Sequence, residues 1–117
     1  MSTSRVVIGS IQLLEDVFEE VTNSWGLSPS EREAVRGTAL TPGRNDRPRR
    51  SRFVTERMAL VVEIDWLLGT RMGAREIRIW VRRRVAGVFG SSPLDDMVGS
   101  TDRLRRIRAL LALEVSE

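Results

Sequence analysis

The most informative stretch of this sequence is Phe89-Gly90-Ser91-Ser92-Pro93-Leu94-Asp95-Asp96-Met97-Val98-Gly99. It begins with a turn rich in Gly and Ser, after which Ser92 can cap a helix and Pro93 can occupy the first helical position. Asp95 places a negative charge in the first turn, where the helix dipole favours it, and Gly99 supplies a stop signal. The stretch therefore predicts a turn followed by a very short helix.

Amphipathic helices are predicted on both sides of this stretch, because apolar residues recur at spacings of three and four with arginines on the outer faces. Thr101 is the predicted cap of the last helix, which covers residues 101–113. The apolar positions are Ala74, Ile77, Trp80 and Val81 before the turn, and Leu104, Ile107, Leu110 and Leu111 after it.

Two more helices are predicted in the N-terminal third. One begins at Ser28, which can form a capping box with Glu31, and stops at Gly37. The other precedes it and ends at Gly26. That first helix has a near-heptad apolar stripe, which could pair two chains or pack inside a monomer. The stripe consists of Ile11, Leu14, Phe18, Val21 and Trp25.

A central buried helix is predicted over residues 52–68, which are apolar nearly all round. The β-branched residues in this run also suit a strand, but its length favours a helix. Leu60, Ile64 and Leu67 define its buried face, so Trp66 is the tryptophan most expected to be an interface anchor, rather than a core or groove residue.

The predicted fold class is all-α, a small bundle of about five to six helices, as the pattern of periodic segments indicates. We divide the chain into an N-terminal helical segment (residues 1–37), an Arg-rich loop or linker (38–51) and a C-terminal helical domain (52–117). No internal repeat is visible in the sequence.

The composition excludes several kinds of chemistry. Cys and His are both absent, so the chain lacks a thiolate, a disulfide, the commonest metal ligand and the commonest general base. Asp95 and Asp96 are adjacent on a helix and point about 100° apart, which suits helix-start charges better than a catalytic pair. We therefore expect a protein that is not an enzyme and needs no cofactor. No apolar run approaches the ~20 residues of a membrane span and no signal peptide is visible, so we expect a cytoplasmic location.

Residues 38–51 contain two prolines and a glycine among arginines, which indicates a loop. Residues 37–57 hold six Arg and two acidic residues, whereas residues 1–36 hold three Arg and six acidic residues. Such a basic cluster suits a phosphate backbone rather than base edges, and a solvated linker is the alternative. The candidate DNA-binding residues are Arg44, Arg47, Arg49, Arg50 and Arg52.

The order of these elements resembles the short Xre/MbcA/ParS antitoxins. In that family a helix ends in a Trp-Gly-Leu-Ser run, as residues 25–28 do here. A later helix contains a Glu-Arg pair like Glu56-Arg57, and a Trp-containing helix leads to a Phe-Gly-Gly-x-x-Pro-Leu-like turn, as in residues 89–94. The resemblance covers most of the chain, from Val17 to its end.

The resemblance implies an antitoxin of a type II toxin–antitoxin pair, with a remnant helix-turn-helix and a toxin-binding C-terminal part. Its partner would be a RES-domain toxin, an enzyme that consumes NAD, and the C-terminal segment would enter or close the NAD cleft. Glu114 and Glu117 could then pair with toxin arginines that otherwise hold phosphates. For Phe89 and Leu94, packing inside the chain is an equal alternative. The implied toxin-binding residues are Trp80, Phe89, Pro93, Leu94, Met97, Arg105, Arg108, Glu114 and Glu117.

The resemblance also implies a homodimer, or a larger complex with toxin, and autoregulatory binding to operator DNA. The prolines of residues 38–51 argue against a standard recognition helix, and residues 83–86 lack the family's Pro-Asn-like loop. DNA binding is therefore the weaker expectation. Two alternatives stay open: a stand-alone DNA-binding transcriptional regulator, and a helical adaptor that binds a partner through its N-terminal stripe.

Overall fold

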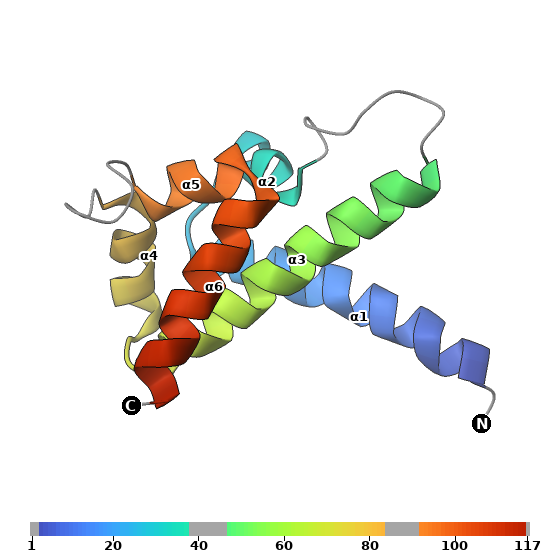
Figure 1. Ribbon diagram of the computed structural model, residues 1–117, viewed down its shortest axis with the longest axis horizontal. Coiled ribbons are helices and arrows are strands. Elements are labelled where there is room, and N and C mark those ends of the chain that lie inside the picture. Colours follow the sequence, from blue (N-terminus) through green and yellow to red (C-terminus); the bar gives the residue numbers. More distant parts are fainter. Residues whose placement is uncertain (1–2, 38–46, 84–91, 117) are drawn as a thin grey trace.

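The computed structural model of the protein describes residues 3–37, 47–83 and 92–116, with side chains for residues 13–37, 52–83 and 92–114. This part of the chain contains six helices and no strand, so the prediction of a small all-α bundle is confirmed (Figure 1). The helices are α1 (Thr3–Ser24), α2 (Pro29–Arg36), α3 (Arg47–Gly69), α4 (Ala74–Arg82), α5 (Pro93–Gly99) and α6 (Thr101–Ser116).

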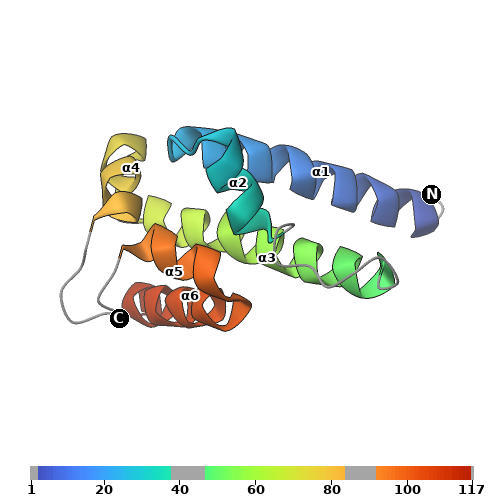
Figure 2. The ribbon, with the colours of Figure 1, turned by 90° about the horizontal axis from the view of Figure 1, so that it is seen from above.

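Helix α3 lies at the centre of the arrangement. Helices α1 and α6 pack on its two sides, and α2 and α5 lie together over one face of these three helices (Figures 1 and 2). Helix α4 contacts α3 and α5 at one end of the molecule. Among the described helices, none covers the opposite face of α1, α3 and α6.

Side-chain caps set the starts of the short helices. The Ser28 hydroxyl accepts from the N–H of Glu31 at 3.2 Å, and the N–H of Ser28 donates to Glu31 Oε1 at 2.8 Å, so the predicted capping box is confirmed. The predicted cap of α5 is confirmed as well, since the Ser92 hydroxyl accepts from the N–H of Asp95 at 3.2 Å. Both caps satisfy first-turn N–H groups that have no partner inside the helix.

The predicted cap of α6 is wrong. Thr101 already belongs to the helix, and the hydroxyl of the preceding Ser100 accepts from the N–H of Arg103 at 3.1 Å. The Thr101 hydroxyl has another partner, because it accepts from Arg57 at 3.1 Å. Two neighbouring hydroxyl residues offered the same local signal, and the contact with a distant helix separates them.

The predicted loop is wrong over residues 47–51, because α3 already begins at Arg47. Pro48 is the second residue of this helix, where a missing N–H leaves no hydrogen bond unmade. Pro48 therefore starts a helix instead of interrupting one. The rest of the predicted loop, residues 38–46, lies outside the described residues. The strand alternative for the apolar run is excluded, since the helix continues to Gly69.

The N-terminal stripe packs into the core of its own chain from Leu14 to Trp25, and the side chain of Ile11 lies outside the described residues. Phe18, Val21 and Trp25 are buried there, and the indole N–H of Trp25 donates to Asp65 Oδ1 on α3 at 2.9 Å. Pairing of two chains, or adaptor binding, through this stripe would require those side chains to leave the core. The structure therefore agrees with the alternative prediction, in which the stripe packs inside a monomer. The core also contains Val35, Val61, Ile64, Leu68, Ile77, Val81, Leu104 and Ile107.

The charged side chain of Arg57 is fully buried at the junction of four helices. Its Nε donates to the Val35 carbonyl at 2.9 Å, one Nη donates to the Thr101 hydroxyl, and the other Nη donates to the Met97 carbonyl. Val35 and Met97 lie in the last turns of α2 and α5, where carbonyls lack partners within their helix and carry the negative end of the helix dipole. Burial lowers the pKa of Arg57, whereas these acceptors favour its charged form.

The space around Arg57 is closely fitted. Gly37 ends α2 in the left-handed region with a φ of 90°, and a Cβ there would lie 2.6 Å from Arg57 Cδ and 2.7 Å from Phe53 Cε1. The Phe53 ring centroid lies 5.6 Å from the guanidinium carbon of Arg57, within the range of a cation–π contact. A side chain at position 37 would therefore displace both residues.

Replacing Arg57 by Met should destabilise the fold by about 3 kcal/mol or more, because buried acceptors without donors cost about 1–3 kcal/mol each. Arg57→Lys should be nearly as damaging, since an ammonium group cannot reproduce the planar fork that spans three acceptors. Urea unfolding followed by circular dichroism measures both losses. The matched control is Arg52→Met, an exposed arginine on the same helix, which should change stability by less than about 0.5 kcal/mol. Equal effects at the two positions would contradict this account.

Candidate functional site

Two arginines attach α4 to the junction of α1 and α2. Arg82 donates to both carboxylate oxygens of Glu31 at 2.7 and 2.8 Å, and to the Gly26 carbonyl at 2.9 Å. Arg78 Nε donates to the Ser24 carbonyl at 3.1 Å. Gly26 itself turns the chain with a φ of 76°. The Trp-Gly-Leu-Ser run of residues 25–28 is therefore part of the place where α4 docks.

The paired Arg82 and Glu31 shift each other's titration. Hydrogen bonds from Arg82, assisted by the N–H of Ser28, lower the pKa of Glu31 from 4.5 to about 2. The Glu31 carboxylate in turn raises the pKa of Arg82. A bidentate pair of this kind gives α4 a fixed orientation as well as an attraction.

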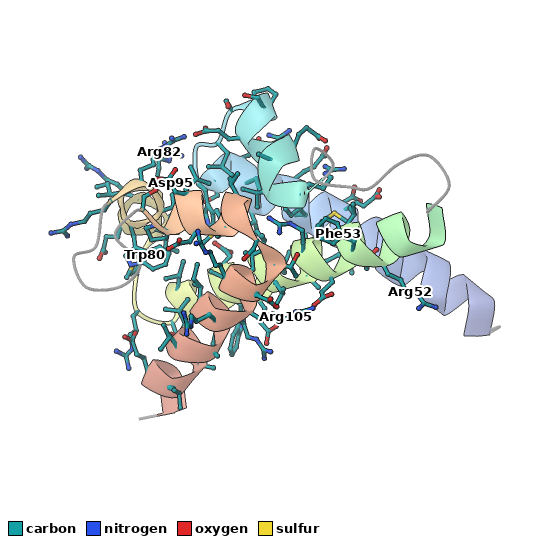
Figure 3. The ribbon with its side chains drawn as sticks, turned by 45° about the horizontal axis from the view of Figure 1, so that its top comes forward. Arg52, Phe53, Trp80, Arg82, Asp95 and Arg105 are labelled. Carbon is teal, nitrogen blue, oxygen red and sulfur yellow. The ribbon has the colours of Figure 1, made fainter. Side chains whose placement is uncertain are left out.

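An open hollow of about 330 Å³ lies between α2 and α5, at the small end of the range of about 300–1,000 Å³ for ligand pockets. Its lining residues are Ser30, Glu31, Ala34, Leu94, Asp95 and Val98. Figure 3 shows Trp80, Arg82 and Asp95 together on this side of the molecule. The lining combines the carboxylates of Glu31 and Asp95 with the apolar residues Ala34, Leu94 and Val98, and Arg82 already binds the Glu31 carboxylate.

The predicted toxin-binding residues of α5 are mostly buried. Pro93, Leu94 and Met97 lie in the interior, where Met97 also gives its carbonyl to Arg57. Trp80 on α4 is half-buried against the core, and Phe89 lies outside the described residues. Pro93, Leu94 and Met97 therefore pack inside the chain. Their role in toxin binding stays a prediction.

The predicted arginines of α6 are already paired with acidic residues. Arg105 donates to Glu56 Oε1 at 2.7 Å and to Asp102 Oδ1 at 2.6 Å, and Glu56 is the main cause of the raised pKa of Arg105. Arg108 lies 3.5 Å from Glu63. Glu56 and Glu63 belong to α3, so these pairs join α6 to the central helix along a solvent-exposed edge.

The last turns of α6 expose their outer side, while Leu111 packs against the core. Leu110 is exposed, and Leu113 keeps 64% of its surface accessible. The Glu114 carbonyl accepts from Arg71, which follows the end of α3, and the Glu114 side chain is exposed. Glu117 lies outside the described residues. Exposed apolar groups with charged residues beside them are found at protein interfaces, which have an apolar centre and a polar rim.

The candidate DNA-binding arginines are brought onto one helix. Arg47, Arg49 and Arg50 lie in the first turn of α3, and Arg52 follows them with an exposed side chain (Figure 3). The side chains of the first three, and all of Arg44, lie outside the described residues. The structure therefore joins four of the five arginines in one helical segment.

Arg57 and Arg82 both join helices, and the sequence predicted neither contact. Arg57 enters the prediction only as half of a Glu-Arg pair, although a charge inside the most apolar segment is a signal for a buried cation. Arg82 enters it as an outer-face residue, and no local signal connects it with Glu31, because the two are distant in the sequence.

Comparison with protein-family models, with curated proteins and with solved structures finds no match. Within the described residues, no helix has the length and apolar character needed to cross a membrane. The same residues contain no group of three or more side chains suited to holding a metal ion.

The stability of the fold should depend on pH through Glu31. Because the folded-state pKa of about 2 lies below the ordinary value of 4.5, ionised Glu31 stabilises the fold above pH 4.5, and this contribution disappears as pH falls towards 2. Glu31→Gln keeps a capping oxygen but removes the charge, so we expect a loss of about 0.5–1 kcal/mol at pH 7 and almost none near pH 2. Urea unfolding across this range measures the difference. In an Arg82→Gln background the same change should cost little at either pH, and an undiminished cost there would rule out the pair as its source.

Proposed function

We propose that this protein is the antitoxin of a type II toxin–antitoxin pair, and that it binds a RES-domain toxin and blocks its NAD cleft. The observation that carries the proposal is the form of α6. Its inner side packs on α3 and α5, whereas the outer side of its last turns presents Leu110, Leu113 and Glu114 to solvent. A helix held in this way can enter a cleft with little loss of conformational entropy.

The positions of the family-like residues support the proposal. Residues 25–28 include part of the site where Arg82 attaches α4, and Arg57 of the Glu-Arg pair ties α2, α5 and α6 to α3. Ser92 and Pro93 start α5. The residues that carry the resemblance therefore occupy joints between helices, so they are the residues that a shared arrangement of helices would require.

The proposed mechanism is steric and needs no chemical step by this chain. Leu113 would supply an apolar anchor, while the carboxylates of Glu114 and Glu117 would pair with toxin arginines that otherwise bind the phosphates of NAD. Arg105 and Arg108, which already pair with Glu56 and Glu63, would lie at the rim and contribute to specificity more than to affinity.

Removing residues 113–117 should abolish neutralisation of the toxin without unfolding the antitoxin, because the core residues of α6 precede this segment. The measurement is cellular NAD in cells that co-express the cognate RES-domain toxin, together with a thermal melt of each purified antitoxin. Ile79→Ala, which alters an exposed apolar residue on α4, is the matched control and should leave NAD protected. Full protection by the truncated chain would contradict the proposal.

A second candidate function is DNA binding by the first turns of α3. The observation that favours it is that Arg47, Arg49, Arg50 and Arg52 share one helical segment, whose first turn contains no acidic residue. The positive end of the helix dipole adds to their charge, so this end of α3 would attract a phosphate backbone. This function could accompany toxin binding as autoregulation, or replace it in a stand-alone regulator.

Replacing Arg47, Arg49, Arg50 and Arg52 by Gln should lower the salt dependence of duplex DNA binding. If all four contact phosphates, the slope of log K against log salt should fall by about 3.6, since each contact contributes about 0.9. Binding measured between low and physiological salt gives the slope. The antitoxin proposal expects the same variant to neutralise toxin normally, whereas an unchanged slope would exclude this helix as the DNA-binding element.

A further inference from the structure

The last turn of α6 is held by a residue from outside that helix. Helix α6 ends at Ser116, so the Glu114 carbonyl is among the last carbonyls of the helix, which have no N–H partner within it. Arg71 donates to this carbonyl from the connection between α3 and α4, which Figure 1 shows beside the C-terminal end of α6. Its positive charge also meets the negative end of the helix dipole. Arg71 therefore caps α6 from a distant part of the chain.

The backbone that carries Arg71 is bonded to the end of α3. Thr70 donates to the Leu67 carbonyl through its N–H at 3.2 Å and through its hydroxyl at 2.7 Å. The N–H groups of Arg71 and Met72 both donate to the Leu68 carbonyl, at 3.1 and 2.9 Å. The side chain of Met72 packs against the core. The Arg71 guanidinium thus reaches α6 from a backbone that α3 and the core fix in place.

Arg71 binds Glu114 by its backbone and leaves the Glu114 carboxylate available. Within the described ranges, no carboxylate lies at ion-pair distance from Arg71, and no arginine lies at that distance from the Glu114 carboxylate. Both side chains are exposed. The two groups of Glu114 therefore have separate roles, since its carbonyl orders the last turn and its carboxylate can meet a cation of a partner.

Packing on the core does not extend to the end of α6. Leu111 still packs against the core, whereas Leu113 keeps 64% of its surface accessible and Glu114 is exposed. The ends of such helices open and close with a free-energy difference near zero. A cation at a helix C-terminus shifts this equilibrium by about two- to fivefold. Arg71 therefore changes a large part of the helical fraction of this turn.

We propose that Arg71 is a positioning residue for toxin neutralisation, because it keeps the last turn of α6 helical. The inference rests on the proposed function, in which Leu113 and Glu114 enter the NAD cleft. On a helix these two side chains have fixed directions, whereas in an open turn they do not. Only the helical fraction then binds, so the affinity falls with that fraction. Arg71 itself needs no contact with the toxin.

The first test needs no toxin. Arg71→Met removes the donors and the charge, and we expect the amide hydrogens of residues 113–116 to exchange about two- to fivefold faster. NMR of the full chain measures these rates residue by residue. Arg71→Lys should restore most of the protection, because an ammonium group can also donate to the last carbonyls of a helix.

The matched control is Arg75→Met. Arg75 is an exposed arginine on α4, and its side chain makes no ion pair or hydrogen bond with the rest of the described chain. Its replacement should leave the exchange of residues 113–116 unchanged. Unchanged exchange in Arg71→Met would overturn the proposal, as would equal acceleration in Arg71→Met and Arg75→Met.

The second test is the affinity for the purified cognate RES-domain toxin, measured by isothermal titration calorimetry. For a turn that is helical about half of the time, we expect Arg71→Met to raise the dissociation constant about two- to threefold. Arg71→Lys should restore the affinity and Arg75→Met should not change it. The melting temperature should be the same in all of these chains, because both arginines are exposed. A weaker complex with unchanged amide exchange would mean that Arg71 contacts the toxin directly, which would overturn a positioning role.

Deletion of residues 113–117 separates this inference from the proposed function. If the deletion abolishes NAD protection while Arg71→Met binds the toxin as tightly as the unaltered chain, the proposed function stands and the role of Arg71 is wrong. If the deleted chain still protects NAD, both are wrong. Loss of protection on deletion, together with faster exchange and weaker binding in Arg71→Met, would support both.

Discussion

The buried guanidinium of Arg57 is the interaction on which the remaining packing depends. The last turns of α2 and α5 each bring one backbone carbonyl into the interior, from Val35 and Met97, and neither carbonyl has a donor within its own helix. An apolar residue at position 57 would leave both carbonyls without a donor. One planar cation satisfies them together with the Thr101 hydroxyl, and so determines where three helices meet α3.

Other arginines use the same chemistry at the surface. Arg78 and Arg82 bind carbonyls of residues 24 and 26, and Arg71 binds the carbonyl of Glu114. In a chain whose basic residues are all Arg, several guanidinium groups thus join a helix to the exposed backbone of another segment. Gly26 of the Trp-Gly-Leu-Ser run lies at one of these joints, where its carbonyl accepts from Arg82.

The sequence predicts the features that depend on local signals. Ser28 with Glu31, Ser92 with Pro93, and Gly37 each mark a helix boundary within a few residues, and the structure confirms all three. The sequence does not predict features that depend on distant partners. The burial of Leu94 and Met97, like the choice of Ser100 over Thr101 as a cap, is decided by helices that local patterns do not place together. The exposure of Trp66 was predictable, because Leu60, Ile64 and Leu67 already define the buried face of its helix.

The contacts of α1 and α2 with the rest of the protein have the form of a bound ligand. Trp25 is the apolar anchor, fully buried with its indole N–H on Asp65, and the carbonyls of residues 24, 26 and 35 supply further polar contacts of these two helices. The covalent connection serves mainly to keep this ligand at a high effective concentration. The protein can accordingly be understood as an intramolecular complex between helices α1 and α2 and the rest of the chain. The affinity between these two parts then contributes a large share of the free energy of unfolding.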